Sequence, residues 1–187
     1  MKITAFVNIQ DYDKDGNLIK ETGFKETNSL VANFAKWIAT NFAQATIGGI
    51  VDIGGTTRNY TTYAGTGRVG AAAGTVTRGI VVGTGTTAVA LTDNVLQTPI
   101  AHGTGAGQLS YGICNGPASW TVAGSDCYCT IDRAFTNSSG GDITIREIGL
   151  YVQWYTSYNM MIEHTIVNHT VTNGTGITVT YKFQVTV

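Results

Sequence analysis

Apolar and polar positions alternate through the C-terminal end of the chain with the period of two that is typical of β-strands. In residues 177–187 every second residue is apolar, and the residues between them are Thr, Lys or Gln. Side chains of a strand point alternately to its two faces. This stretch therefore predicts a strand with one buried face, while the other face meets water or another subunit.

The stretch Asp142–Val152 interrupts this period. Its apolar side chains occupy two odd positions and then three even positions. Such a change of parity cannot occur in one flat, regular strand. We predict an irregular ladder at Arg146–Glu147, where a bulge or a bend would absorb the change. The two apolar sets are predicted to face opposite sides: Ile143 and Ile145 on one, and Ile148, Leu150 and Val152 on the other.

Further short strands are predicted along the chain. The turn Asp15-Gly16-Asn17 joins the first two into a hairpin, and the spacing of the later ones is typical of an antiparallel all-β domain. Asp93–Thr98 is interpreted as a brief helical turn. The predicted strands are 3–10, 18–25, 50–53, 76–83, 108–114, 119–123, 127–136, 143–155, 160–168 and 177–187.

One helix is predicted near residues 29–44. Asn28 or Ser29 can cap its N-terminus. Its apolar residues recur at helical spacing, and we expect this stripe to cover the core of the domain. The stripe consists of Leu30, Val31, Phe34, Trp37, Ile38 and Phe42.

These elements predict a mostly β protein, an antiparallel β-sandwich with one flanking helix. A jelly-roll arrangement of the sandwich is an alternative that the sequence leaves open. The 187 residues are expected to form a single domain, with an N-terminal hairpin (1–27), the helix (29–44) and the sandwich (48–187). A long loop is expected near 58–74, and loops of that length are commonly functional. It is the first place to look for partner binding.

The composition limits the classes of partner that the chain is expected to bind. Charged residues make up 12 % of the chain and the formal net charge is −1, which gives no electrostatic basis for binding nucleic acid or a membrane surface. The sequence contains no long apolar run, so neither a signal peptide nor a membrane span is expected.

Two groups of residues leave alternatives open. Asp11, Asp13 and Asp15 match the start of a calcium loop, but the twelfth position is Thr22 rather than Glu, which favours a plain hairpin turn over a bound cation. Cys114 could form a disulfide with Cys127 or Cys129, although free thiols are favoured.

Catalytic chemistry is weakly supported. His102, His164 and His169 are the natural general bases, and the last two are expected on opposite faces of one strand. Glu147 and Glu163 could form a glycosidase-type pair, but a structural role for Glu147 is favoured.

The glycines of Gly83-Thr-Gly-Thr-Thr lack the Lys and helix of a phosphate loop and are interpreted as turns. We predict no catalytic, cofactor-binding or metal-binding residue and no enzyme activity.

Aromatic residues offer another hypothesis. Exposed tryptophans with neighbouring tyrosines could stack against sugars, although core or interface roles are favoured. The residues concerned are Trp37, Trp120, Trp154, Tyr155 and Tyr158.

Several short segments together resemble a broad group of small tailed-bacteriophage virion proteins, which serve as head-decoration, tail or fibre-associated components. The resemblance covers most of the chain after residue 28, and Arg58–Gly74 departs from it. It is carried by Asn28-Ser-Leu-Val-Ala-Asn, Gly79-Ile-Val-Val-Gly-Thr-Gly-Thr-Thr-Ala, Asp93, Leu96, Phe135-Thr-Asn-Ser-Ser, Ile145-Arg-Glu-Ile-Gly-Leu-Tyr, Met161-Ile-Glu-His and Ile177-Thr-Val-Thr-Tyr-Lys-Phe.

The resemblance implies a non-enzymatic structural protein that is assembled in the host bacterial cytoplasm and resides in the virion. It would form homo-oligomers and bind other capsid or tail proteins, with no cofactor. The alternative is a carbohydrate-binding adhesin module that contacts a host-surface glycan.

Overall fold

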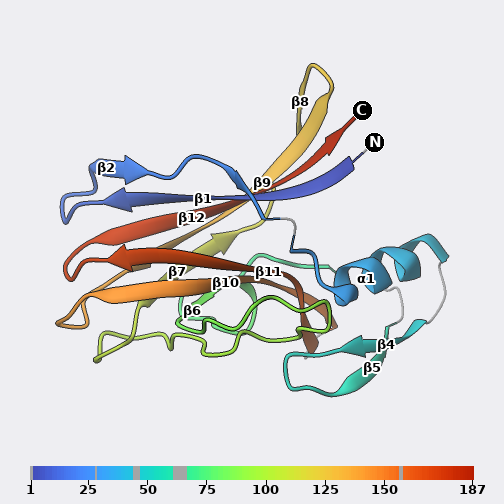
Figure 1. The fold of residues 1–187 in the computed structure, drawn as a ribbon, viewed down its shortest axis with the longest axis horizontal. Coiled ribbons are helices and arrows are strands. Elements are labelled where there is room, and N and C mark those ends of the chain that lie inside the picture. The colour runs from blue at the N-terminus through green and yellow to red at the C-terminus, as the bar shows by residue number, and fades with distance from the viewer. Residues whose placement is uncertain (1, 28, 44–46, 61–66, 156–157) are drawn as a thin grey trace.

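The computed structural model describes residues 2–27, 29–43, 47–60, 67–155 and 158–187 and shows a mostly β protein (Figure 1). Its elements in chain order are β1 (Lys2–Tyr12), β2 (Leu18–Glu21), β3 (Lys25–Glu26), α1 (Ala32–Ala43), β4 (Ile47–Val51), β5 (Thr57–Tyr60), β6 (Gly79–Gly83), β7 (Ser110–Asn115), β8 (Thr121–Ala123), β9 (Asp126–Thr136), β10 (Ile143–Tyr155), β11 (Tyr158–Val171) and β12 (Gly176–Thr186).

Two antiparallel sheets enclose the core. The larger, seven-stranded sheet has the order β2-β1-β12-β9-β7, with β3 also paired to β1 and β8 also paired to β9. The smaller sheet has the order β11-β10-β6, and β4 and β5 form a separate hairpin. The predicted sandwich is confirmed. The strand order of these two sheets differs from that of a jelly roll, in which eight strands form two Greek keys.

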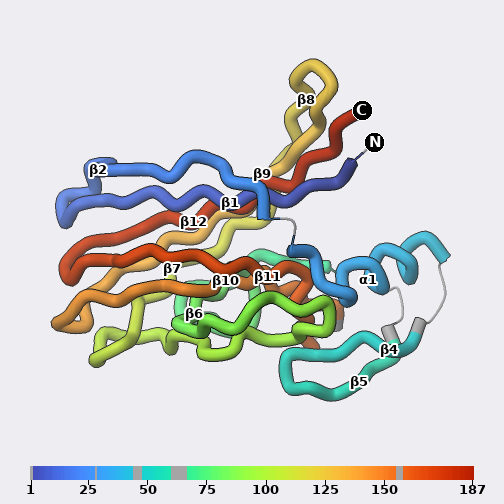
Figure 2. The backbone as a smooth tube through the Cα atoms, viewed as in Figure 1, coloured from blue at the N-terminus to red at the C-terminus, as the bar shows by residue number. Residues whose placement is uncertain are grey.

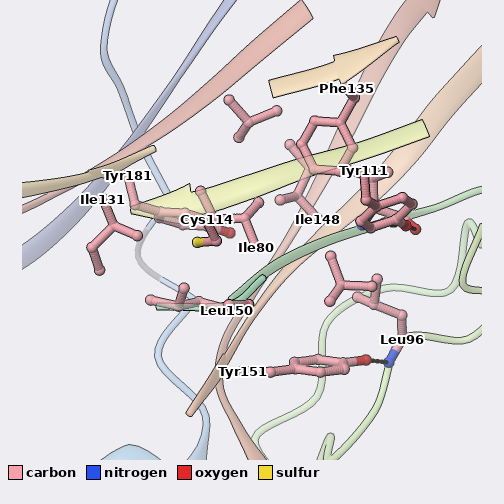
Figure 3. Close-up of a cluster of buried hydrophobic side chains, with 14 of the residues drawn as sticks. Ile80, Leu96, Tyr111, Cys114, Ile131, Phe135, Ile148, Leu150, Tyr151 and Tyr181 are labelled. Atoms are coloured by element: carbon pink, nitrogen blue, oxygen red, sulfur yellow. Dashed lines mark hydrogen bonds between the residues drawn. The ribbon is translucent and has the colours of Figure 1, made fainter. Parts of the chain in front are cut away.

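The core forms where the inner faces of the two sheets meet. On β12 the side chains of Ile177, Val179 and Tyr181 are buried, and Val7 and Ile9 of β1 lie beside them in the same cluster. Figure 3 shows how side chains from both sheets interlock in part of this cluster. Burying each such aliphatic side chain contributes about 1.5–3 kcal/mol.

Arg133 of β9 is a charged residue inside this core, with no exposed surface. Its guanidinium donates to four backbone carbonyls rather than to a carboxylate, and it lies 4.8 Å from the ring centroid of Tyr111. Burial lowers the pKa of Arg133. The four acceptors belong to Ala72, Arg78, Ile80 and Gly112, so this side chain ties β6 and the segment before it to the large sheet.

The N-terminal hairpin is confirmed as β1 with β2 and β3. Its turn is closed by Asp13, whose carboxylate accepts hydrogen bonds from the backbone amides of Asp15 and Asn17 and from the side chain of Asn17. An aspartate that bonds backbone groups just ahead of it is a common device of tight turns.

The helix begins later than predicted, at Ala32, and ends at Ala43. The reason is that residues before it pair with β11: the amide of His164 donates to Ser29, and the amide of Val31 donates to Ile162. This extended pairing uses backbone groups that a first helical turn would need. Residues 28 and 44 lie outside the described part of the chain.

The predicted apolar stripe of the helix is only partly correct. Phe34 and Trp37 pack against the core, but Phe42 is 84 % exposed. A polar contact helps to fix the helix, since Asn33 both donates to and accepts from the backbone of Val51 on β4.

The expected long loop near 58–74 is irregular over most of its described residues, apart from part of β5 and two isolated bridges. Residues 57–60 form β5, and residues 61–66 lie outside the described part of the chain. Arg68 exchanges backbone hydrogen bonds with Gln153 of β10, and Ala71 does so with Cys114 of β7. These isolated bridges attach the irregular stretch to β10 and β7, which the local sequence does not indicate.

One predicted strand is shorter than expected, and one predicted helical turn is wrong. The strand predicted over 76–83 begins only at Gly79, after bends at 76–78. Residues 93–98 contain bends rather than a helical turn. The strands predicted at the C-terminal end all occur.

The ladder between β10 and β11 is irregular where the sequence predicted it. Ile145 pairs with His169 and Glu147 pairs with Ile166, so the register shifts between them. Arg146 is exposed, whereas residues 147–152 are continuously buried. The outer face of β10 is thus open to solvent before the irregularity and covered after it.

The two apolar sets of β10 do not face opposite sides, however. Ile145 pairs with His169, whose ring contacts β1, and Leu150 pairs with Glu163, whose carboxyl contacts β12. Cross-strand partners share a face, so both sets face the large sheet. The irregularity shifts the alternation by one residue and thereby keeps the apolar side chains on the core side.

Candidate functional site

The carboxylate of Glu147 lies in a cradle of backbone amides. Oε1 accepts from the amides of Gly85 and Thr98 at 3.0 and 2.7 Å, and Oε2 accepts from the amide of Gln97 at 2.9 Å. Glu147 has no exposed surface. The glycine-rich turn after β6 therefore holds an anion that belongs to the chain itself.

His164 of β11 lies beside this carboxylate and links it to a second one. Its Nδ1 is 2.8 Å from Oδ2 of Asp93, and its Nε2 is 3.4 Å from Oε2 of Glu147. His164 is 3 % exposed. The result is a row Asp93–His164–Glu147, in which His164 and Glu147 are buried and Asp93 is partly exposed.

The positive charge of His164 and the negative charge of Glu147 stabilise each other. Burial disfavours the cationic form of His164, but the two carboxylates outweigh it and raise its pKa above the usual value. Burial likewise disfavours ionised Glu147, yet His164 and the three amides together lower its pKa. An imidazolium between two carboxylates is the arrangement that these directions favour.

The segment Thr84–Thr98 brings these groups together, because it folds over the outer face of β10 (Figure 2, light green between β6 and β7). The hydroxyl of Tyr151 accepts from the amide of Leu96 at 2.9 Å (Figure 3). Gly149 lies close to both side chains, since a Cβ added there would be 3.0 Å from Cδ2 of Leu96 and 3.1 Å from Cε1 of Tyr151. Small and polar residues on this face of β10 thus allow an irregular segment to approach closely.

Glu163 lies on the other face of the same strand. It has no exposed surface, and the hydroxyl of Tyr181 on β12 donates to its Oε2. Burial raises the pKa of Glu163 to about 8, against the opposing effect of that hydrogen bond. A protonated carboxyl is therefore favoured at neutral pH.

The two glutamates do not form a catalytic pair. Glu147 faces the covering segment and Glu163 faces the large sheet, so the two carboxyl groups belong to separate polar clusters. A glycosidase needs both carboxyl groups on the two sides of one substrate bond. Each cluster can bind protons and stabilise the fold. The two glutamates and His164 are almost entirely shielded from solvent.

The remaining histidines also have structural partners. His169 faces the core side of β11 and lies 2.7 Å from Asp11 of β1, while His164 faces the outer side, which confirms their opposite orientation. Nδ1 of His102 accepts from the amide of Tyr111 at 3.0 Å.

The acidic residues of the first hairpin are separated. Asp11 bonds to His169, Asp13 closes the turn, and Asp15 lies 2.9 Å from Lys14. Within the described residues, no group of three or more His, Cys, Asp or Glu side chains is placed to hold a metal ion.

The three cysteines are free. Cys114 is buried, and burial raises its pKa. Cys127 is exposed and Cys129 is partly buried, both on β9. The predicted alternative of a disulfide is therefore not adopted.

The aromatic residues do not assemble into one platform. Trp154 is 3 % exposed and Trp37 packs against the core, whereas Trp120 is 77 % exposed next to β8. Tyr158 stacks beneath Arg58, whose guanidinium carbon is 4.0 Å from the ring centroid. The side chain of Tyr155 lies outside the described part of the structure.

Comparison of the chain with protein-family models, with curated protein sequences and with solved structures finds no match. Among the residues described, no helix has the length and apolar character that crossing a membrane requires.

Sequence reasoning missed several residues of these clusters. Asp93 and Tyr181 each complete a pair across distant segments, and Arg133 bonds to carbonyls contributed by three regions of chain. Tyr181 was predicted to be buried, which was a signal that its hydroxyl needs a partner. Nothing in the local sequence identifies which partner.

Proposed function

We propose that this chain is a non-enzymatic structural protein of a tailed-bacteriophage virion, which forms homo-oligomers and binds other capsid or tail proteins. The proposal rests on one observation: the residues best suited to catalysis have structural roles. Glu147 and His164 are buried: Glu147 accepts from three backbone amides, and His164 lies between Glu147 and Asp93. They stabilise a covering segment and present no surface to a substrate.

The resemblance of short segments to virion proteins supports the same function. Segments that carry it include residues 79–88, 145–151 and 161–164, which contain β6 and the polar clusters on β10 and β11. A covering segment held by hydrogen bonds to a buried carboxylate suits a protein that must keep its shape within a lattice.

Antibody labelling of phage particles tests this proposal. Label over the whole head is expected for a decoration protein, and label at a single vertex for a tail or neck component. Particles that carry no label, although the chain is present in infected cells, would contradict the virion role.

One observation favours a second candidate, the carbohydrate-binding adhesin module. Trp120 is 77 % exposed, and an exposed indole ring can stack against a sugar. Glycan-array binding that is lost in Trp120→Ala and kept in Phe42→Ala would support the adhesin. Phe42 is a suitable control because it is also highly exposed, on α1. Equal signals from both variants would argue against it.

A further inference from the structure

The large sheet continues past the small one, and its inner face is uncovered there. Four side chains lie at the same register on four neighbouring strands: Ile3 pairs with Val185, Val185 with Cys127, and Cys127 with Val122. We call these four residues the distal row. Cross-strand partners share a face, so the row forms one continuous apolar strip across β1, β12, β9 and β8.

The distal row belongs to the core side of the sheet. Along β1, Ile3 has the same parity as the buried Ala5 and Val7, and along β12, Val185 has the same parity as Tyr181. No register shift interrupts the pairing of β1 with β12 or of β12 with β9. The row is therefore the direct continuation of the core.

Despite this position, the distal row is open to solvent. Val122 is 72 % and Ile3 44 % exposed, Cys127 is exposed and Val185 is partly exposed. Trp120, two residues before Val122, adds a further exposed ring. In Figure 1 the β8–β9 hairpin and the adjoining ends of β1 and β12 project beyond the rest of the domain.

The row carries no charge. Lys2, Asp126 and Lys182 lie at alternate positions of the same strands and therefore point to the opposite face. Lys2 is paired there with Glu26, Asp126 accepts from Thr186, and the ammonium of Lys182 lies over aromatic rings. A charged partner such as nucleic acid would find nothing complementary on this face.

We propose that the distal row is a self-association surface, on which a second copy of this chain packs face to face about a twofold axis. The second copy supplies an uncharged strip of the same length and composition. The row and Trp120 together expose on the order of 500 Å². Two copies would bury about 1,000 Å², near the lower end for specific interfaces.

A face-to-face contact also accounts for why the strip is limited to one end of the sheet. An isologous contact uses the same patch on both copies and closes after two. This inference rests on the proposed function, because it identifies the surface by which the structural protein would form its homo-oligomer.

The test is a measurement of molar mass over a concentration series up to about 100 μM. The wild-type chain is expected to reach the mass of a dimer. Val122→Asp should raise the dissociation constant by about 100-fold or more, because it buries an unpaired charge within the contact. Val122 is mostly exposed in the single chain, so thermal unfolding curves that agree at concentrations where the wild type is monomeric show that the variant folds.

Ile19→Asp is the matched control, since Ile19 is 62 % exposed on β2, away from the distal row. It should leave the dissociation constant within about threefold of wild type. A second readout is the reaction of Cys127 with a thiol reagent, which dimerisation should slow in the wild type and in Ile19→Asp but not in Val122→Asp.

Three results would overturn the inference: a wild-type chain that stays monomeric, a Val122→Asp variant that dimerises as well as wild type, or an Ile19→Asp variant that dissociates equally. The last would indicate head-to-tail contact. Particle labelling tests the virion role separately, so labelled particles together with a monomeric chain would reject only this surface. Unlabelled particles together with a dimer would reject only the virion role.

Discussion

The hydroxyl of Tyr181 on β12 donates a hydrogen bond to Oε2 of Glu163 on β11, which joins the two sheets through a polar contact in the middle of the core. Both residues are fully buried. Because burial raises the pKa of Glu163 to about 8, the carboxyl remains uncharged at neutral pH and avoids the large cost of a buried anion. This contact predicts how stability depends on pH.

The pKa of Glu163 is higher in the folded protein than its ordinary value of 4.5. Its contribution to the free energy of unfolding is therefore fully present below about pH 4.5, and it falls by about 1.4 kcal/mol per pH unit as the pH rises toward about 8. Glu163→Gln cannot ionise and should flatten this decline in urea unfolding experiments.

The raised pKa of His164 acts in the same direction, so Glu163→Gln should retain some loss of stability as the pH rises. Wild type and variant curves that remain parallel from about pH 5 to about pH 9 would show that Glu163 is already ionised in the folded protein.

Glu147→Ala should destabilise the protein by about 3–5 kcal/mol, because it leaves three backbone amides and His164 without their buried acceptor. Hydrogen exchange should become faster at the amides of Gly85, Gln97 and Thr98. Arg146→Ala, one residue earlier and exposed, is the control and should change the free energy of unfolding by less than about 0.5 kcal/mol. Equal effects of the two substitutions would mean that the amide cradle does not stabilise the fold.

Gly85→Ala should cost more than about 2 kcal/mol, because the added Cβ would lie 2.5 Å from Oε1 of Glu147 and 2.6 Å from Cβ of Gln97. Gly141→Ala meets no heavy atom within 4 Å, so its cost should be under about 1 kcal/mol. Thermal unfolding of the two variants checks this difference. If Gly85→Ala is as stable as Gly141→Ala, close approach is not what selects glycine after β6.

Arg133→Met should destabilise the protein by about 3 kcal/mol or more, although methionine is apolar and the site is buried. The substitution removes the donor for four carbonyls that line the core. Arg133→Lys should recover part of this loss, because its ammonium can still donate to some of them. A Met variant of wild-type stability would show that the carbonyls find other partners.

Much of the β framework could be predicted from local sequence. The alternation over 177–187 gave the correct strand, and the change of parity within 142–152 correctly located the irregular ladder. These features follow from the two-residue period of side chains, which depends on neighbours in the chain alone.

Tertiary structure decided which face each set occupies and where the helix begins. Both apolar sets of β10 face the large sheet because the irregular ladder shifts the alternation, and the helix starts at Ala32 because residues 29–31 pair with β11. The start of the helix depends on partners more than a hundred residues away, and the faces of β10 depend on the irregular pairing with β11. The local pattern specifies neither outcome.

For the polar clusters, too, the sequence determined one part and the tertiary structure another. The sequence by itself determined that Glu147, Glu163 and His164 lie on neighbouring strands of a β domain with few charges. Only the tertiary structure decided that they separate, with Glu147 and His164 beneath a covering segment and Glu163 in the core. The physical reason is that a buried charged or polar group must find a bonding partner, and in this fold those partners come from segments distant in the chain.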